Sequence, residues 1–271
     1  MEKRGVHNIL WPLMTDAVNI AARRLQEAGI DNAANEARWL CEGAGEALFA
    51  ERVKRRIKGE PLQYILGTVP FHCVELYVGP GVLIPRPETE QLVEIALSLP
   101  RPSGPICDLC TGSGAIALAM AHALKDVRFT GIDLSCEALE WAERNRTALS
   151  LENVSFLQGD LYGPLQEDDK FAMITANPPY VSPDEYSRLD SVVKDYEPRL
   201  ALEAGEDGLQ AIRRIIEGAS RHLLPGGAII MEIGDKQGAA VKELFSRSGI
   251  DAEIRRDYAG KERFAVAITG E

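Results

Sequence analysis

The sequence predicts an α/β protein in which a mostly parallel sheet is covered by helices on both faces and preceded by a small helical unit. Three observations predict this class. After Glu88 the chain alternates regularly between helical and β-type segments, whereas before residue 60 its apolar residues recur at helical spacing. The length of 271 residues suffices for one large domain and a smaller one.

The first predicted unit, residues 1–60, is helical. Apolar residues recur at helical spacing from Thr15 to about Ala50, with a break between two helices at Gly29-Ile30-Asp31. A third helix runs from Glu51 to Lys58 and carries a basic run, opposite in sign to the net charge of -11. Two interpretations stay open for this run: a solvated helix face, or a docking surface for an acidic or RNA-associated partner.

A linker, residues 61–87, is expected to follow. It contains two short β-type runs, Tyr64 to Leu66 and Cys73 to Val78, punctuated by glycines and prolines. This pattern predicts a linker that contains a β-hairpin.

The second large unit, residues 88–271, alternates helices and strands and contains seven predicted strands. The last two strands are separated only by Asp257 to Arg263, which is too short for a crossover helix, so we expect them to pair antiparallel. The predicted strands are Ile106–Leu109, Val127–Asp133, Val154–Gln158, Phe171–Ala176, Ala228–Ile233, Ala252–Arg256 and Phe264–Thr269, and the helices are Glu88–Leu99, Ala115–Leu124, Glu137–Ser150, Gly208–Leu223 and Lys236–Arg247.

Composition and charge narrow the class of function. A chain with 45% hydrophobic and 26% charged residues is typical of a folded globular protein. The net charge of -11 would repel a phosphate backbone, which disfavours a nucleic-acid substrate. The sequence has no run of 18 apolar residues, and Met1 to Leu10 does not resemble a signal peptide, so we expect no membrane association and a cytoplasmic location.

The first strand of the predicted sheet ends in a glycine-rich turn, Asp108 to Gly114. Glycine allows the backbone to turn tightly and approach a ligand, and the helix that follows offers unpaired N–H groups. Asp133, at the end of the next strand, could accept hydrogen bonds from both ribose hydroxyls of a nucleoside. The alternatives are a plain turn and a capping role for Asp133, although Ser135 is better placed to cap the next helix.

The spacing of this turn matches neither a dinucleotide fingerprint nor a triphosphate-binding loop, so an adenosine with a small, partly cationic tail fits better. After the third strand, Asp160 could accept from an adenine amino group and Leu161 could cover the ring. A surface turn is the competing interpretation for both residues.

Five cysteines form an odd set that does not suggest a disulfide framework. Cys107 and Cys110 form a C-x-x-C pair, typical of redox chemistry or half of a zinc site, but the pair straddles an apolar strand and no second pair follows. We therefore expect reduced thiols and no metal site.

The fourth strand leads directly into Asn177-Pro178-Pro179-Tyr180. Two prolines remove two backbone donors, so the turn presents the Asn177 side-chain oxygen and the Pro178 carbonyl as acceptors for the two hydrogens of an –NH2 group. Such a grip would orient an amide nitrogen and stabilise the positive charge that develops as a methyl group is transferred to it. Tyr180 could pack on the planar substrate group. A structural turn is the alternative.

Together these residues resemble the HemK/PrmC family, the N5-glutamine methyltransferases that modify the Gly-Gly-Gln tip of peptide chain release factors. The resemblance covers most of the chain and depends most on its Pro-Arg-Pro-Glu-Thr-Glu and Glu-Pro-x-x-Ala-Leu stretches. The matching segments are Gly59–Gly67, Leu83–Glu90, Asp108–Gly114, Asn177–Tyr180 and Glu197–Leu202, with Gly205 and Asp207-Gly208-Leu209.

This resemblance implies a seven-stranded class I, Rossmann-like methyltransferase domain that uses S-adenosyl-L-methionine. Asn177, Pro178, Pro179 and Tyr180 would hold the glutamine, and the helical unit would engage the body of the release factor. Two residues depart from the family: Cys110 stands where glycine is usual, and Leu161 where an aromatic is frequent. The cofactor contacts that it implies are Cys110, Thr111, Gly112, Ser113, Gly114, Asp133, Leu161 and Asn177, and Asp160 joins this expected set from its place after the third strand.

The expected activity is methyl transfer from S-adenosylmethionine to the side-chain amide of a release-factor glutamine, by a monomer. The alternatives are a glutamine methyltransferase of a ribosomal protein, and a nucleic-acid methyltransferase acting on adenine or guanine amino groups. A binding module without cofactor affinity is a further alternative, because Cys110 replaces glycine.

Overall fold

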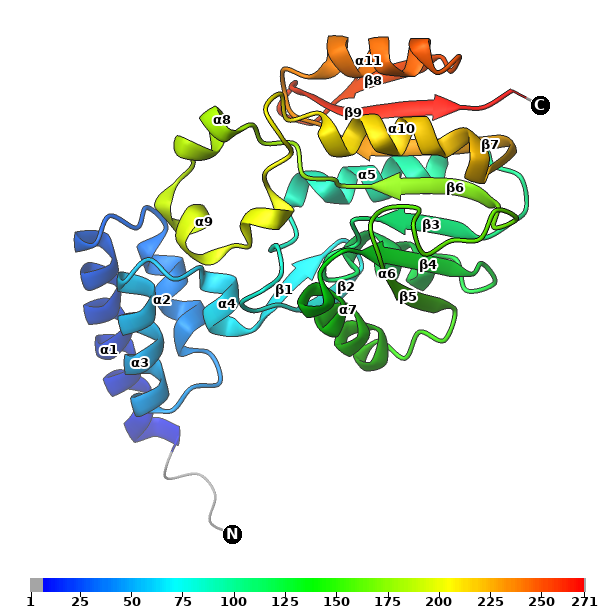
Figure 1. Cartoon of the computed structure of the whole chain (residues 1–271). Coiled ribbons are helices and arrows are strands. Elements are labelled where there is room, and N and C mark those ends of the chain that lie inside the picture. Colours follow the sequence, from blue (N-terminus) through cyan, green and yellow to red (C-terminus); the bar gives the residue numbers. More distant parts are fainter. Residues whose placement is uncertain (1–6, 271) are drawn as a thin grey trace. The chain divides into compact units, whose positions relative to one another are not determined.

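The computed structural model describes residues 7–270, and its contacts divide the chain into two compact units. One unit comprises the residues up to Gly67 together with Ser191–Tyr196, and the other comprises Thr68–Asp190 and the residues from Glu197 onward (Figure 1). Residues 1–6 of the predicted helical unit, and Glu271 at the other end, lie outside the described residues.

The smaller unit is built from helices α1 (His7–Glu27), α2 (Ala33–Cys41), α3 (Glu46–Ile57), α4 (Leu62–Leu66) and α9 (Ser191–Tyr196). Its core gathers apolar residues from the first four helices, with Leu25, Ala37 and Leu40 fully buried. The predicted third helix begins earlier than expected, because Gly43 adopts a φ of +64° and breaks the chain between α2 and α3.

The arginines of α3 bond within this unit. Arg52 donates to the carbonyls of Leu40 and Glu42 at the end of α2, both at 3.0 Å. Arg56 pairs with Glu36 at 2.6 Å, and Arg55 pairs with Glu60. The basic run therefore serves largely to fasten neighbouring helices.

The expected β-type run at Tyr64 to Leu66 is wrong, because these residues form the short helix α4. Tyr64 and Ile65 are buried there, and Gly67 ends the helix with a φ of +82°. Packing of the two apolar side chains outweighs their β-propensity. The hairpin itself is present one step later, as the antiparallel strands β1 (Thr68–Phe71) and β2 (Val74–Tyr77).

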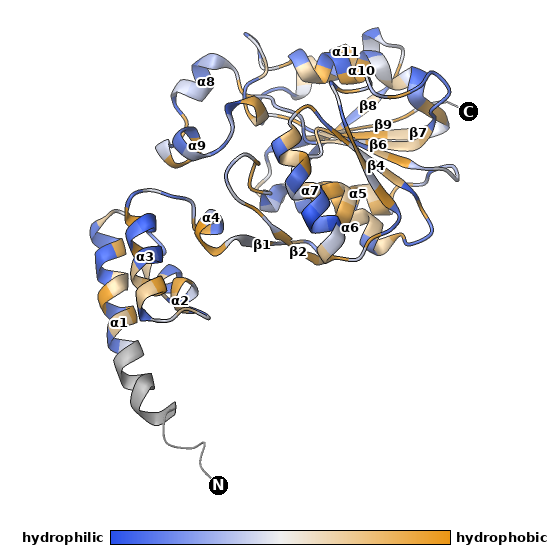
Figure 2. Cartoon of the chain, turned by 60° about the horizontal axis from the view of Figure 1, so that its bottom comes forward, coloured by the Kyte–Doolittle hydropathy of each residue, from blue (hydrophilic) through white to orange (hydrophobic). Residues whose placement is uncertain are grey.

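The larger unit is organised around a seven-stranded sheet in the order β5-β4-β3-β6-β7-β9-β8. Strand β9 runs antiparallel to both of its neighbours, which confirms the predicted terminal hairpin. The central strands are buried and hydrophobic (Figure 2). The strands are β3 (Ile106–Leu109), β4 (Phe129–Asp133), β5 (Val154–Gln158), β6 (Phe171–Ala176), β7 (Leu223–Glu232), β8 (Ala252–Arg256) and β9 (Glu262–Ile268).

Two sets of helices pack on this sheet: α6 contacts both α5 and α7, and α10 contacts α11. The strand order changes direction between β3 and β6, so right-handed crossovers place the two sets on opposite faces. Open α/β sheets bind ligands at such a point, beyond the carboxyl ends of the strands. The helices are α5 (Pro87–Ser98), α6 (Ala115–Ala123), α7 (Cys136–Ala148), α10 (Gln210–His222) and α11 (Gly238–Arg247).

Predicted and observed elements of the sheet domain differ mainly at their ends. Strand β7 begins at Leu223, five residues before the prediction, and its register with β6 shifts there. No element was predicted for the stretch that forms α8 (Pro183–Ser187), α9 and the 3-10 turn η1 (Arg199–Ala201). These pieces are too short to give a periodic signal. Within residues 7–270, no helix is long and apolar enough to cross a membrane.

Candidate active site

The turn between β3 and α6 is tightly wound. Cys110, Gly112 and Gly114 all adopt left-handed conformations, with φ of +57°, +56° and +81°. A Cβ on Gly114 would lie 2.9 Å from the Leu118 side chain and 3.0 Å from the Phe156 side chain, so any other residue there would displace these side chains as well as strain the backbone. A Cβ on Gly112 would instead meet only Val82 at 4.0 Å, which leaves room above the turn.

Two residues of this region carry backbone strain. Cys110 and Leu161 (φ +51°) are non-glycine residues in the left-handed region, which costs about 1–2 kcal/mol each. Cys110, which stands where the family usually has glycine, thus adopts a backbone conformation that glycine would adopt without strain. Burial raises the pKa of the Cys110 and Cys107 thiols well above the usual range, which disfavours the thiolates that redox chemistry needs.

Asp133 ends β4 beside the glycine turn. Its carboxylate accepts from the Gly112 N–H at 2.8 Å and from the Ser135 N–H at 2.9 Å, while Ser135 caps α7 through the Ala138 N–H, as predicted. Burial raises the pKa of Asp133. Because each carboxylate oxygen can accept a second hydrogen bond, Asp133 retains capacity for two hydroxyl donors.

Asp160, after β5, is engaged differently from expectation. Both of its oxygens accept from Arg214 of α10, each at 2.9 Å, in an ion pair that is about half exposed. A ligand amino group would therefore share this carboxylate with Arg214. Leu161 beside it is buried, which suits a residue that covers an apolar ring.

A cavity of about 490 Å³ opens at this edge of the sheet. Its size lies within the range of about 300–1,000 Å³ that small-molecule sites occupy. All of the predicted cofactor residues except Gly114 line it. Gly114 instead lies against the side chains of Leu118 and Phe156. Asn177 and Pro179 also line the cavity, whereas Pro178 and Tyr180 do not belong to its walls.

Asn177 follows β6 and is half-buried. Its side-chain Nδ2 donates to Thr89 Oγ1 at 3.2 Å. Among the described residues, no hydrogen bond is donated to Asn177 Oδ1 or to the Pro178 carbonyl. The two acceptors that the sequence predicts are therefore both without a protein donor at this corner.

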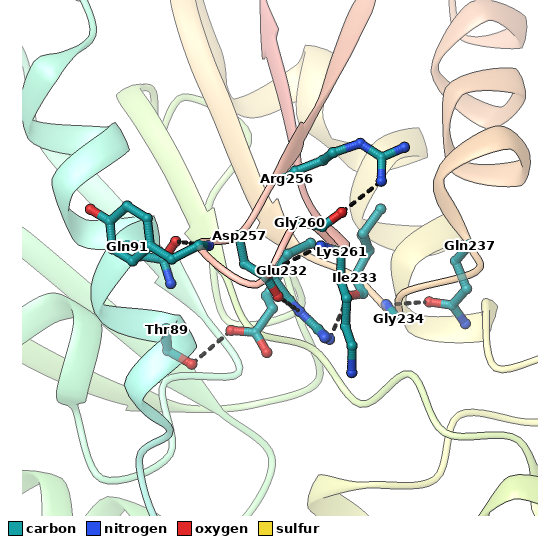
Figure 3. Close-up of polar contacts among 12 residues, drawn as sticks. Thr89, Gln91, Glu232, Ile233, Gly234, Gln237, Arg256, Asp257, Gly260 and Lys261 are labelled. Atoms are coloured by element: carbon teal, nitrogen blue, oxygen red, sulfur yellow. Dashed lines mark hydrogen bonds and ion pairs between the residues drawn. The ribbon is translucent and has the colours of Figure 1, made fainter.

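Behind Asn177 lies a buried carboxylate that the sequence analysis did not identify. Glu232, at the end of β7, is 2% exposed and accepts from Thr89 Oγ1 at 2.7 Å (Figure 3). Its other oxygen accepts from the Tyr180 hydroxyl at 3.2 Å. Tyr180 thus directs its hydroxyl to Glu232, and its ring packs against the core of the sheet.

The walls of the cavity are joined by a second buried carboxylate. Glu197 accepts from Arg86 at 2.6 Å and from the Ile84 N–H at 3.1 Å, which ties the loop before α5 to the segment that leads into η1. This pairing gives Arg86 a structural role that its sequence context left unassigned. Further along, a Cβ on Gly208 would lie 2.4 Å from the Tyr180 carbonyl, so glycine is required for this close approach.

Several of the residues that the sequence analysis missed still carried a signal. Thr89, Glu197 and Gly208 lie within the stretches that resemble the family, but no chemistry was assigned to them. The only signal at Glu232 is an acidic residue at the end of an apolar strand, a position that places a charge at the ligand-binding edge of the sheet.

Proteins of similar sequence are methyltransferases. A sequence family described as "Methyltransferase domain" matches residues 101–259. The release factor glutamine methyltransferase of Thermodesulfovibrio yellowstonii is 46% identical over 219 residues, 79% of this chain and 78% of that protein. The protein of the same name from Streptomyces coelicolor is 36% identical over 277 residues, 94% of this chain and 98% of that protein.

A solved structure supports the fold. The crystal structure of a methyltransferase from Pyrococcus furiosus has a TM-score of 0.55 and 20% identity, covering 72% of this chain and 89% of that one. The glycine turn, the carboxylate at the end of β4 and the Asn-Pro-Pro-Tyr corner lie together on this methyltransferase fold, and the relatives match over most of their length. The chain belongs to the release factor glutamine methyltransferase family.

Proposed function

We propose that this S-adenosylmethionine-dependent enzyme methylates the side-chain amide nitrogen, N5, of the glutamine in the Gly-Gly-Gln motif of peptide chain release factors. The observation that carries the proposal is the corner at Asn177, where the side-chain Nδ2 is bonded to Thr89 and Oδ1 is left to accept. The names of the relatives support the release factor as substrate.

The cavity fits the cofactor on its own features. The space above Gly112 admits a ligand against the backbone, and Asp133 has acceptor capacity for two ribose hydroxyls. Ile132, Leu134 and Leu161 supply an apolar lining for a ring. We assign cofactor binding to Cys110–Ser113, Asp133, Asp160, Leu161 and Asn177, whereas Gly114 supports the turn from outside the cavity. When bound, S-adenosylmethionine supplies an electrophilic methyl group on a positively charged sulfur.

The corner addresses the weak nucleophilicity of an amide nitrogen, whose lone pair is delocalised into its carbonyl. Asn177 Oδ1 and the Pro178 carbonyl would accept the two hydrogens of the substrate –NH2, fixing the nitrogen and stabilising its developing positive charge. The proton becomes acidic only as the new N–C bond forms, so a general base is not required beforehand. Pro179 would line the glutamine site, and Tyr180 supports the corner from behind through its hydrogen bond to Glu232.

The test is a transfer assay with S-adenosylmethionine labelled in its methyl group. We expect label on the Gly-Gly-Gln glutamine of a purified release factor, located by mass spectrometry, and none on a Gly-Gly-Ala variant of it. Ribosomal proteins and RNA serve as competing substrates in parallel reactions. Label on a ribosomal protein or on RNA alone would contradict the proposal.

We further propose that the helical unit, the predicted residues 1–60, engages the body of the release factor, and that the enzyme acts as a cytoplasmic monomer. The unit has its own core and is thus a separate surface for a protein substrate. Sedimentation of the full chain alone and mixed with release factor tests this proposal. A stable dimer of the enzyme would contradict the monomer.

A further inference from the structure

The Asn177 side chain has two ends of opposite hydrogen-bonding character. Its oxygen accepts and its –NH2 donates, so a rotation of 180° about the last bond exchanges them. An –NH2 substrate offers only donors, and a rotated Asn177 would set donor against donor. Turnover therefore requires something that fixes which end faces the cavity.

Thr89 is the group that contacts Asn177, and the direction of its own hydrogen bond is set by Glu232. Thr89 Oγ1 lies 2.7 Å from Glu232 Oε2. An ionised carboxylate can only accept, so the single hydroxyl hydrogen of Thr89 is committed to Glu232. What Thr89 presents to Asn177 is then a lone pair, which accepts only from Nδ2.

The surroundings of Glu232 are consistent with an accepting carboxylate. Its second oxygen accepts from the Tyr180 hydroxyl at 3.2 Å, so both oxygens face donors. Burial raises the pKa of Glu232, and Glu88 acts in the same direction, whereas the donors Thr89 and Tyr180 and the positive charge of Arg263 oppose this rise. Arg263 is itself held by Asp257 and by the Ile233 carbonyl, both at 3.3 Å.

We propose that Glu232, acting through Thr89, is a positioning residue that holds the Asn177 amide with Oδ1 toward the substrate nitrogen. This inference rests on the proposed function and deepens it. It explains the enzyme's preference for an –NH2 substrate by residues from three places: α5, the end of β7 and the residue that follows β6. The hydrogen-bonded series Glu232–Thr89–Asn177 is termed the orienting chain.

The first test is kinetic. Thr89→Val keeps the shape of the side chain but removes its hydroxyl. Glu232→Gln introduces an amide that can donate to Thr89, which reverses the direction of the hydrogen bonds in the orienting chain. We expect kcat to fall about 10- to 100-fold in both, the size of effect that follows loss of the partners that orient metal ligands, with KM for S-adenosylmethionine changed less than about threefold. Thr89→Ser should restore most of the turnover.

A matched control lies in the hairpin, where Thr68 Oγ1 donates to Glu75 at 3.1 Å outside the cavity. Thr68→Val removes a bond of the same type and should leave kcat unchanged.

The pH profile adds a readout that a purely structural role would not move. In the wild type kcat should fall as Glu232 becomes protonated on the acidic side, and this limb should be lost in Thr89→Val. An unchanged kcat in Thr89→Val, or an unchanged acidic limb, would overturn the proposal.

A spectroscopic test needs no turnover, and so separates this proposal from the function itself. With 15N-labelled asparagine, the Asn177 side-chain signal is the one missing from Asn177→Ala. We expect its –NH2 hydrogens to exchange slowly with water in the wild type and in Thr89→Ser, and rapidly in Thr89→Val. Rapid exchange in the wild type would overturn the orienting chain even if methylation occurs, whereas slow exchange without methylation would count against the function alone.

Discussion

Polar side chains do different work in the helical unit and at the carboxyl edge of the sheet. In the helical unit, the arginines of α3 donate to backbone carbonyls and carboxylates within about 20 residues of them in the sequence. These hydrogen bonds join parts of the same small unit. At the sheet edge, Thr89, Asn177 and Glu232 come from segments up to 143 residues apart, and their bonds leave one acceptor over.

Structural and functional polar groups can be separated by the acceptors that their hydrogen bonds leave free. The arginines in the basic run of α3 form hydrogen bonds within the helical unit. Thr89 and the buried Glu232, in contrast, orient the side chain of Asn177. Buried polar groups are costly unless they are bonded, so a set that is bonded yet still leaves an acceptor facing a cavity marks a site.

The largest effect is expected for Asn177→Ala. This change removes the acceptor that faces the substrate, so kcat should fall about 10²- to 10³-fold, as when one preorganised hydrogen-bonding group is removed from a catalytic site. The fold should persist because Asn177 is half-buried and outside β6. Steady-state kinetics with a release factor, together with circular dichroism, measures both. Full activity in this variant would contradict the role given to Asn177.

The edge of the sheet also contains Glu197, and Glu197→Ala should have the next largest effect. The change leaves Arg86 without its carboxylate and the Ile84 N–H without an acceptor. Breaking a buried ion pair costs about 3–5 kcal/mol, and the partial exposure of Arg86 reduces this to about 2–3 kcal/mol.

Urea unfolding measures this loss, and Glu203→Ala is the matched control on the same segment. Glu203 pairs with Arg199, whose side chain is 66% exposed, so its loss should cost less than about 1 kcal/mol. The double variant Glu197→Ala with Arg86→Met should recover part of the stability, since no unpaired charge is left. Equal losses for Glu197 and Glu203 would mean that the cavity walls are not held together by Glu197.

The sequence predicted the sheet well because its signals are local. Strands such as Ile106–Leu109 and Phe171–Ala176 are short apolar runs bounded by turn residues, and the structure has them with the same bounds. The glycine turn and the Asn-Pro-Pro-Tyr corner were equally visible, because glycine and proline constrain the backbone wherever they stand.

The rest depended on contacts between distant segments. Tyr64 and Ile65 form a helix only because their side chains are buried there, and Asp160 is paired with an arginine 54 residues away. The roles of Glu232 and Glu197 follow from partners 143 and 111 residues away along the chain, respectively, which no local pattern encodes.

A smaller, pH-dependent effect is expected at Asp108, the fully buried carboxylate below the glycine turn. It accepts from Thr111 at 2.6 Å and Thr175 at 2.8 Å, but burial raises its pKa to about 7. Because the folded pKa exceeds the unfolded value, the stability that Asp108 contributes is fully present below about pH 4 and is lost as pH rises through about 7.

Asp108→Asn removes this titration. Relative to the wild type, the variant should gain about 1–2 kcal/mol of unfolding free energy between about pH 5 and pH 6.5, since one proton changes the slope by at most about 1.4 kcal/mol per pH unit. Urea unfolding at several pH values measures the difference, in which the other carboxylates cancel. A difference that is flat with pH would show that Asp108 is ionised with an ordinary pKa.

The smallest effects are expected in α3, where exposed and bonded basic residues lie on one helix. Lys54 is 63% exposed and only 4.0 Å from Glu51, so Lys54→Gln should change the unfolding free energy by less than about 0.5 kcal/mol. Arg52→Gln removes the donor to two carbonyls at the end of α2 and should cost about 1 kcal/mol. Because the bonds of Arg52 are to neutral carbonyls, its cost should persist in high salt, whereas any effect of Lys54 should vanish. The free energy of unfolding of both variants, measured in low and high salt, checks this. Equal, salt-sensitive losses would mean that α3 stabilises the unit through its net charge instead of through the individual hydrogen bonds of its arginines.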